Sequence, residues 1–502
     1  MLNLIRYFRN RDRNLSSSHR PRLTSPRHCP KKLRSISILI LFALPCLAWA
    51  TAEPNLGGSF VLDTDLLPLE ELEKRRDATR AELNQLANFN LNGSVGSICF
   101  RSMPQAHESD RQWVQITLDR EYPIDEIALV PALWRDNENG YRDDGFPRQF
   151  QIFAGRVNDE VGQLMADVTA DGALLPRVAP LIIPGHSVIA SWIRIEAALL
   201  SPRFHDGGYI LQFAEVMVFS GSENVALHQT VTASSSQRAG IGAYKPEFLV
   251  DGFLPYIMDA AQGQKSNPYL SGFDIGDQAT LTIDLGVPTE ITTLRIHAIE
   301  QGDTVPHALQ PNFAVPPHFI FEGANQENFS DAVPLWDYQH RNLFEIAPIV
   351  TQRIKPQISR YVRLRCIAPF FFEGFTNSGM PVSGTRVGFA EIELFSGAEN
   401  VALGKDFTAN YDISLHDPNR PLSRLTDGHN IFGKILPFRE WISQLARRHD
   451  LEFQLPIVER AIQQRYEDQK SKLRLWVGIA ALLGVLTIIV FLADRILRQR
   501  AI

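Results

Sequence analysis

The sequence contains one motif twice, and this duplication limits the fold more than any other feature. The first copy, Phe-Ala-Glu-Val-Met-Val-Phe-Ser-Gly, begins at Phe213, and the second, Phe-Ala-Glu-Ile-Glu-Leu-Phe-Ser-Gly, begins at Phe389, an offset of 176 residues. The same offset links Asp251-Gly252 to Asp427-Gly428. A register shared by separated pieces is the mark of an internal repeat. Each copy runs on into Glu-Asn-Val-Ala-Leu, which we interpret as the start of the next unit.

The hydrophobic pattern between the two ends of the chain has a period of two. Residues 113–119, 150–154 and 192–196 alternate between apolar and polar types, and glycine-containing turn signals separate such runs. Short strands with frequent turns and no helices between them are typical of antiparallel sandwiches. The sequence therefore predicts a mainly β fold with two tandem sandwiches, at 92–221 and 222–398.

The two ends of the chain predict export and a single anchor. Residues 1–50 are basic at first, then apolar, and end in Ala48-Trp49-Ala50, the layout of a secretory signal peptide. Near the other end, about 19 residues from Leu475 carry no charge, which is long enough to cross a bilayer, and the arginines that follow favour the cytoplasmic side. Pro456 should kink or split the helix that precedes this span. The remaining predicted segments are an N-terminal helical segment (51–91), an incomplete third repeat start or linker (399–437), a juxtamembrane helix (438–473), a transmembrane helix (474–494) and a short cytoplasmic tail (495–502).

Charge argues against a nucleic-acid-binding protein, and cysteine usage excludes a disulfide framework. The net charge is −6, but residues 1–50 hold ten Lys or Arg and one acid, which leaves 40 basic and 55 acidic residues in the remainder. An acidic body argues against nucleic acid as a partner. Of the four cysteines, Cys29 and Cys46 fall in the leader, so Cys99 and Cys366 could form one bridge or, as we expect, remain as two buried free thiols.

Several short pieces of the sequence carry a family resemblance. They are Asn224-Val225-Ala226-Leu227, Val250-Asp251-Gly252, the run 280–286 and the run 390–395. With these pieces the units resemble discoidin-type domains, also called coagulation factor 5/8 C-terminal domains, of the galactose-binding-like superfamily. The resemblance implies an eight-stranded jelly-roll sandwich that binds ligands, often sugars, with loops at one end.

The order of the segments carries a second resemblance. A leader, a short helix, tandem sandwiches, Arg439-Glu440-Trp441 opening a charged helix and a single span resemble the extracytoplasmic half of certain bacterial membrane histidine kinases. The sequence ends at Ile502 without a phosphoacceptor helix or a nucleotide-binding part, so kinase activity is not carried over. The partners expected from this resemblance are a second copy of the chain or a separate kinase.

One loop of the first sandwich concentrates the side chains that recognise polyols. Trp134, Arg135, Tyr141, Arg142 and Asp143 combine aromatic faces, which stack on sugar C–H surfaces, with groups that hydrogen-bond hydroxyls. We predict a ligand site there. The alternative is a solvated loop with one or two aromatic rings packed beneath it.

The family resemblance also implies a metal position. Asp251 and Glu391 match positions that help to hold a structural Ca²⁺ in calcium-bearing relatives, together with backbone carbonyls. A hard cation of this kind requires several oxygens. The alternative is an Asp-Gly turn and an acidic residue on an edge strand.

Catalytic motifs are not evident, so we predict that the chain is not an enzyme. It contains no His-Glu-x-x-His, no Gly-x-Ser-x-Gly, no phosphate loop and no Cys-x-x-Cys. We predict a single-pass membrane protein whose body lies in the periplasm or outside the cell and captures a glycan or another small ligand, as a sensor-like module without its own kinase. The first alternative is a structural or adhesive surface protein whose sandwiches contact other proteins. The second is an enzyme with these units as accessories, which would need a further catalytic domain.

Overall fold

The computed structural model describes residues 67–91, 99–136, 140–203, 207–237, 244–276, 278–299, 314–339, 348–375, 379–413 and 418–499. The predicted signal peptide, 1–50, lies outside these residues.

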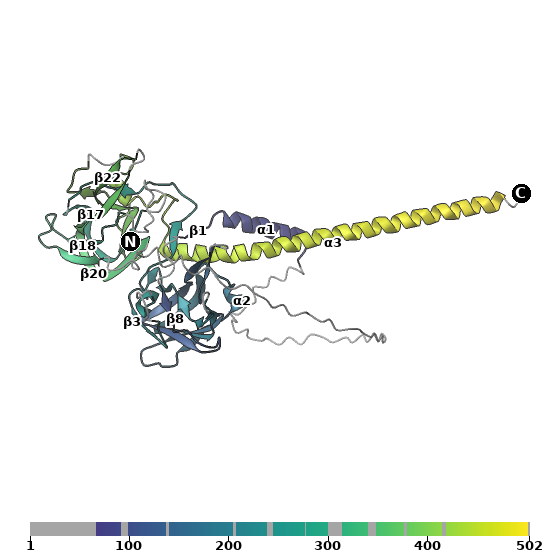
Figure 1. Cartoon of the computed structure of the whole chain (residues 1–502), viewed down its shortest axis with the longest axis horizontal. Helices are drawn as coiled ribbons and strands as arrows, with labels where there is room; N and C mark the ends of the chain where they lie inside the picture. The colour runs from purple at the N-terminus through teal and green to yellow at the C-terminus, as the bar shows by residue number, and fades with distance from the viewer. Residues whose placement is uncertain are drawn as a thin grey trace, which may run out of the picture. The chain divides into compact units, whose positions relative to one another are not determined.

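Two large antiparallel sheets with the same strand order form the body (Figure 1). The first runs β13-β12-β3-β8-β6-β7 with β14 also on β3, and the second runs β25-β24-β17-β20-β18-β19 with β26 also on β17. The strands of the first are β3 (Gln112–Val130), β6 (Gln149–Gly155), β7 (Gln163–Thr169), β8 (Leu181–Leu199), β12 (Glu215–Ser220), β13 (Glu223–Asn224) and β14 (Thr230–Ala233). Those of the second are β17 (Thr280–His297), β18 (His318–Ala324), β19 (Val333–Gln339), β20 (Ile349–Ala368), β24 (Glu391–Ser396), β25 (Glu399–Asn400) and β26 (Phe407–Ala409). The predicted fold class, two tandem antiparallel jelly-roll sandwiches, is confirmed.

Short elements complete both sandwiches. The two-stranded pairs are β2 (Phe100–Arg101) with β11 (Gln212–Phe213), β4 (Leu133–Asp136) with β5 (Gly140–Asp143), β9 (Ser201–Pro202) with β10 (Tyr209–Ile210), β16 (Tyr269–Leu270) with β23 (Gly388–Phe389), and β21 (Phe370–Phe375) with β22 (Pro381–Arg386). The short helices are α2 (Ala170–Ala173), η2 (Pro246–Leu249) and η3 (Leu422–Leu425).

Long bent strands give each sandwich its two layers. The first half of β3 pairs with β14 and the second half with β12, and the register shifts between Thr117 and Tyr122. Because side chains alternate across a strand, each half sends every second residue inward. Val114 and Ile116 from the first half and Ile127 and Leu129 from the second are all fully buried in one core. The long strand β17 has a similar shift in its pairing with β20, after Asp284.

The domain boundaries predicted at 221/222 and 398/399 are wrong. β14 pairs with β3 of the first sandwich, and Val225, Ala226, Leu249 and Val250 belong to the first core. In the same way β25 and β26 pair with β24 and β17, so residues 399–409 complete the second sandwich rather than starting a third unit or a linker. The Glu-Asn-Val-Ala-Leu motif therefore closes each sandwich. It resembles an opening in the sequence because a Ser-Gly turn precedes it.

The outer face of β3 and β12 in the first sandwich is also buried. Ala128, Val130, Met217 and Phe219 pack in a second apolar cluster with Trp441, which is completely buried. This double burial explains why residues 127–130 are continuously apolar, as in strands covered on both faces. The cluster fixes the start of the C-terminal helix to the first sandwich.

The described part of the N-terminal segment forms a helix and a strand. α1 (Leu69–Leu83) packs on the C-terminal helix α3 (Phe438–Gln499), with Leu72 in a cluster with Val458 and Ile462. An ion pair of 2.7 Å joins Arg80 to Glu459. The predicted helix is confirmed for 69–83, but β1 (Asn88–Leu91) pairs with β15 (Tyr256–Asp259) as a strand.

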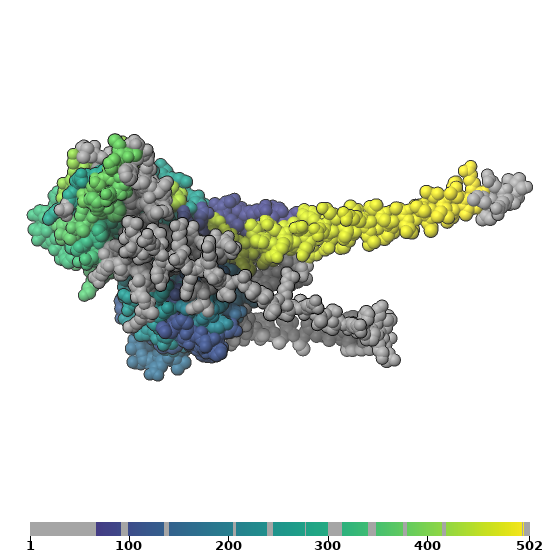
Figure 2. Space-filling view, in the orientation of Figure 1, coloured from purple at the N-terminus to yellow at the C-terminus, as the bar shows by residue number. Residues whose placement is uncertain are grey.

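α3 continues without a break from the sandwiches into the apolar segment. The predicted split at Pro456 is wrong, because the helix spans Phe438–Gln499. In the described part of the chain it is the one helix with a stretch long and apolar enough to cross a membrane. None of that stretch is buried, and Figure 2 shows its side chains clear of the sandwiches. α3 therefore supports a single membrane span.

The two body cysteines form no disulfide among the described residues, as expected. Cys99 and Cys366 are both buried, in separate apolar clusters. Burial raises the pKa of each thiol to about 12, so neither is reactive at neutral pH.

Candidate functional site

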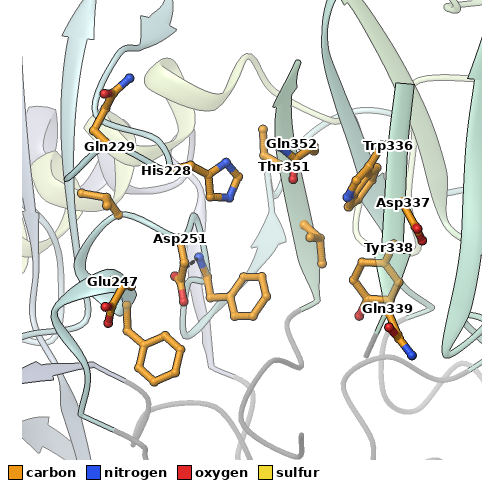
Figure 3. A pocket seen from close by; sticks show the side chains of 14 residues that line it. His228, Gln229, Glu247, Asp251, Trp336, Asp337, Tyr338, Gln339, Thr351 and Gln352 are labelled. Carbon is orange, nitrogen blue, oxygen red and sulfur yellow. Dashed lines mark hydrogen bonds between the residues drawn. The ribbon is translucent and has the colours of Figure 1, made fainter. Parts of the chain in front are cut away.

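A pocket of about 470 Å³ lies between the two sandwiches (Figure 3). This volume falls within the range of small-ligand pockets, about 300–1,000 Å³. One wall comes from residues 228–253, which close the first sandwich, and the other from β19 and the start of β20 in the second. Its existence thus depends on the motif that completes the first sandwich.

The wall from the first sandwich is mixed in character. His228 and Gln229 lie just before β14, and Glu247 and Phe248 lie on η2. Asp251 follows η2, and its Oδ1 accepts the backbone N–H of Phe253 at 3.0 Å. This wall offers two carboxylates, an amide and an imidazole beside apolar surface.

The wall from the second sandwich is rigid. Trp336 stacks on Phe321, with ring centroids 5.9 Å apart, and Tyr338 stacks on Phe319 at 4.7 Å. These rings are almost completely buried, so the core fixes their positions. Asp337, between them on β19, is exposed and lies 2.9 Å from the imidazole of His318. Gln339 and Gln352 add two amides to the lining.

Direct contacts between the sandwiches border the pocket. The Arg353 guanidinium forms a 2.9 Å ion pair with Glu223 and donates to the Tyr122 hydroxyl at 2.8 Å. Thr351, two residues earlier, lines the pocket, and its hydroxyl accepts a hydrogen bond of 3.0 Å from Arg295. Arg295 also lies over the ring of Phe438, the first residue of α3, at 4.6 Å. A chain of contacts therefore runs from the pocket to the root of α3.

The residues predicted to bind ligand lie elsewhere, on the β4–β5 hairpin, and not on one face of it. Trp134 is opposite Arg142, and Leu133 is opposite Asp143. Because successive residues of a strand point to opposite faces, Trp134 and Arg142 share one face and Tyr141 and Asp143 share the other. Tyr141 packs against the apolar cluster around Trp441, while Trp134 is 39% exposed. The side chain of Arg135 lies outside the described residues.

The inward face of this hairpin has a structural role. Asp143 accepts the backbone N–H of Arg177 at 3.4 Å, and burial raises the pKa of its carboxyl to about 6. The neighbouring Asp144 forms a buried ion pair of 3.1 Å with Arg101. Of the five predicted residues, Trp134 is thus the one with a large exposed apolar surface.

The two residues predicted to share a metal belong to different sandwiches. Asp251 lies beside Glu215, whose Oε1 accepts the N–H of Gly252 at 3.1 Å. Glu391 instead accepts the N–H of Gly428 at 3.0 Å and lies beside Asp427. The predicted pairing of Asp251 with Glu391 is therefore corrected to two equivalent pairs, one in each sandwich.

The two carboxylate pairs differ in their surroundings. In both sandwiches burial and neighbouring acids raise the pKa of the glutamate, Glu215 or Glu391, well above its usual range, and its Oε2 has no hydrogen-bond partner among the described residues. The difference lies in the aspartate. In the second sandwich Asp427 accepts hydrogen bonds from Arg424 at 3.0 Å and from Ser266 at 2.6 Å. The position of Arg424 corresponds to Phe248 in the first sandwich, at the offset of 176 residues. The pair in the first sandwich therefore fits a cation better than the pair in the second.

No protein-family model and no curated protein matches the chain. Solved structures that are similar include the arabinofuranosyltransferase AftD from Mycobacteria (13% identity, 62% of this chain and 27% of that chain, TM-score 0.18). Others are the CBM32-1 and CBM32-2 domains of ZmpB from Clostridium perfringens (9% identity, 64% and 96%, TM-score 0.19) and a fucolectin from striped bass serum (11% identity, 65% and 100%, TM-score 0.18). At TM-scores this low, what these proteins bind is not carried over to this chain.

Sequence reasoning missed the pocket residues His228, Glu247, Trp336 and Asp337. They lie about 100 residues apart in the chain, and they meet because the first sandwich ends after residue 250 rather than at 221. A correct boundary would have placed His228 and Glu247 beside the second sandwich. Among the described residues, no three His, Cys, Asp or Glu side chains form a group that could hold a metal.

Proposed function

We propose that this chain is a non-enzymatic, membrane-anchored binding protein that captures a saccharide-like ligand in the pocket between its sandwiches, outside the membrane. The observation that carries the proposal is the composition of the pocket, whose lining combines aromatic residues with carboxylates and amides. Such a mixture suits polyols, because ring faces pack on C–H surfaces and the polar groups hydrogen-bond hydroxyls.

A binding assay with two variants tests this proposal and locates the site. The full chain, solubilised in a neutral detergent, is screened on a glycan array, and hits are measured by calorimetry. We expect Gln229→Trp, which fills the pocket from a half-buried position, to weaken binding at least tenfold. Trp134→Ala, on the β4–β5 hairpin, should leave the affinity unchanged. The opposite result would move the site to the hairpin, and no binding by the unmodified chain would refute ligand capture.

The helix contacts support a role as a sensor-like module. Arg439 on α3 donates to Glu126 at 3.2 Å and to the carbonyl of Gly221 at 2.6 Å, both in the first sandwich. Phe438 lies under Arg295 of the second sandwich. Since both sandwiches hold the first turn of α3, a ligand that changes their spacing would act on the helix that enters the membrane. A second copy of the chain or a separate kinase would receive that change.

The rival function, structural or adhesive contact with other proteins, lacks one feature that would favour it. An exposed flat apolar sandwich face marks an assembly surface. In the first sandwich the apolar outer face of β3 and β12 is already covered by Trp441 and its neighbours on α3. Ligand capture is therefore the better supported proposal.

We propose calcium binding for the first sandwich only. Ca²⁺ takes six to eight oxygens, and Glu215 and Asp251 would supply carboxylates, with carbonyls or water for the remainder. The guanidinium of Arg424 beside Asp427 opposes a cation in the second sandwich.

Thermal unfolding tests the calcium proposal with a matched pair of variants. We expect 1 mM calcium to raise the unfolding temperature of the unmodified chain relative to EDTA, because a ligand that binds only the folded state stabilises it. Glu215→Gln should abolish this shift, whereas Glu391→Gln should keep it. An equal loss in both variants, or no shift in the unmodified chain, would contradict a site in the first sandwich.

A further inference from the structure

The pocket between the sandwiches carries an excess of negative charge. Glu247 and Asp251 line it from the first sandwich. Asp337 lines it from the second, although its carboxylate lies on the opposite face of β19 from Trp336 and Tyr338 (Figure 3), so the first sandwich supplies most of the negative charge. Among the described lining residues there is no Lys or Arg. The nearby bases are His228 in the lining, His318, which is paired with Asp337 at 2.9 Å, and Lys245 beside Phe248. An acidic ligand would bring further negative charge into this space and lose solvation there.

The aromatic lining also favours a positively charged ligand. Phe248 and Phe253 come from the first sandwich, and Trp336 and Tyr338 from the second. The face of an aromatic ring attracts a cation placed within about 6 Å of its centre. Lys245 already shows this near the pocket, since its ammonium lies 5.7 Å from the centre of the Phe248 ring. Because Trp336, Tyr338 and Phe248 are at most 8% exposed, their ring faces add little, and a cation in the pocket would be held mainly by the carboxylates.

We propose that the pocket selects ligands that carry a protonated amine, such as amino sugars whose amine is not acetylated, over their neutral and acidic counterparts. This selectivity rests on the proposed function, because it takes the same pocket as the binding site. The physical basis is that hydrogen bonds from an ammonium to a carboxylate are stronger than those between neutral groups. The uncharged ring faces and amides would hold the remainder of the sugar.

Three oligosaccharides of equal length test how the charge of the ligand affects its affinity, apart from its size. They are the tetramer of glucosamine, which is cationic, the tetramer of N-acetylglucosamine, which is neutral, and tetragalacturonate, which is anionic. Calorimetry on the full chain in neutral detergent, with EDTA and about 50 mM salt, should show the glucosamine tetramer binding at least tenfold more tightly than the neutral tetramer. Tetragalacturonate should not bind. High salt should reduce the difference in affinity between the glucosamine tetramer and the neutral tetramer, since it screens the charges.

Two charge-neutralising variants test whether the pocket itself is responsible for the preference for the cationic tetramer. Glu247 is exposed on η2, so Glu247→Gln removes a pocket carboxylate without disturbing the core. We expect it to weaken binding of the glucosamine tetramer severalfold more than it weakens binding of the neutral tetramer. Glu160→Gln removes the same charge from an exposed position outside the pocket lining and should affect neither. Equal effects of the two variants would overturn the inference.

Spermidine, an amine without a sugar, distinguishes failure of the inference from failure of the proposed function. Equal affinity for the cationic and neutral tetramers would overturn amine selectivity and leave saccharide capture standing. Binding of spermidine with no tetramer bound would support amine selectivity and overturn saccharide capture. If none of the four probes binds, both are overturned.

Discussion

Arg177 and His449 show how single buried side chains join α3 to the first sandwich. The guanidinium of Arg177 is 1% exposed and donates to the carbonyls of Ala173, Ala179 and Pro180. It also lies 3.4 Å from Asp450 on α3. Next to it, His449 is hydrogen-bonded through Nε2 to the carbonyl of Leu174 at 3.1 Å. Burial, and then the charge of Arg177, lower the pKa of His449 to about 4.

Acid should therefore weaken the attachment of α3. Because the pKa of His449 is lower in the folded state than its ordinary 6.5, the unfolded chain binds the proton more tightly, and stability is lost as the pH falls below 6.5 toward 4. The contribution is roughly 1–2 kcal/mol between pH 7 and pH 5. We expect His449→Gln, measured by chemical denaturation, to make the loss of stability across this range shallower. His107→Gln, which removes a histidine outside this cluster, should keep the original slope, and an unchanged slope in His449→Gln would contradict the assignment.

At the scale of elements, β14 and η2 decide where the first sandwich ends. Val225, Ala226, Leu249 and Val250 are fully buried in its core although they follow the repeated motif at 213–221. Burying a side chain the size of Val or Leu contributes about 1.5–3 kcal/mol. Their combined loss would approach the whole stability of an ordinary domain, about 5–15 kcal/mol.

Fragments of the first sandwich should therefore behave very differently according to their last residue. A fragment of residues 99–255 retains β14 and η2, and we expect it to unfold cooperatively in a thermal melt. A fragment of residues 99–221 exposes the edge of β3 that β14 covers, so it should aggregate or fail to melt cooperatively. Equal melting of both fragments would show that the closing segment does not stabilise the sandwich.

The sequence carried enough information for the fold class, but not for the boundaries or the site. Period-two runs such as residues 113–119 became strands, because the alternation reflects one buried face of each layer. The motif at Asn224 was misassigned, because local pattern does not show which sheet edge a short strand will join. The composition of the Trp134 hairpin predicts a ligand site, yet strand alternation divides its side chains between two faces. Glu247 and Asp337 carry no local signal, since only tertiary packing brings them together.

At the scale of the whole molecule, α3 offers one candidate span, and labelling can determine on which side of the membrane the body lies. Chemical labelling with a membrane-impermeant maleimide can report this side in a chain whose Cys29 and Cys46 are replaced by Ser, because Cys99 and Cys366 are buried thiols. We expect Glu160→Cys, at an exposed position of the first sandwich, to be labelled in intact cells. Gln499→Cys, at the end of α3, should be labelled only after the membrane is opened. The reverse pattern would place the sandwiches in the cytoplasm.

The unbroken helix α3 also sets the distance between the sandwiches and the membrane. From the buried Trp441 to Leu475, where the uncharged stretch begins, α3 advances by about 1.5 Å for each residue, which amounts to roughly 50 Å. In a helix standing upright, the contact between Asp450 and Arg177 would lie about 37 Å, and the buried Trp441 roughly 50 Å, from the start of the uncharged stretch. The ligand pocket would then sample polymers and solutes well away from the bilayer surface, rather than lipids lying within it.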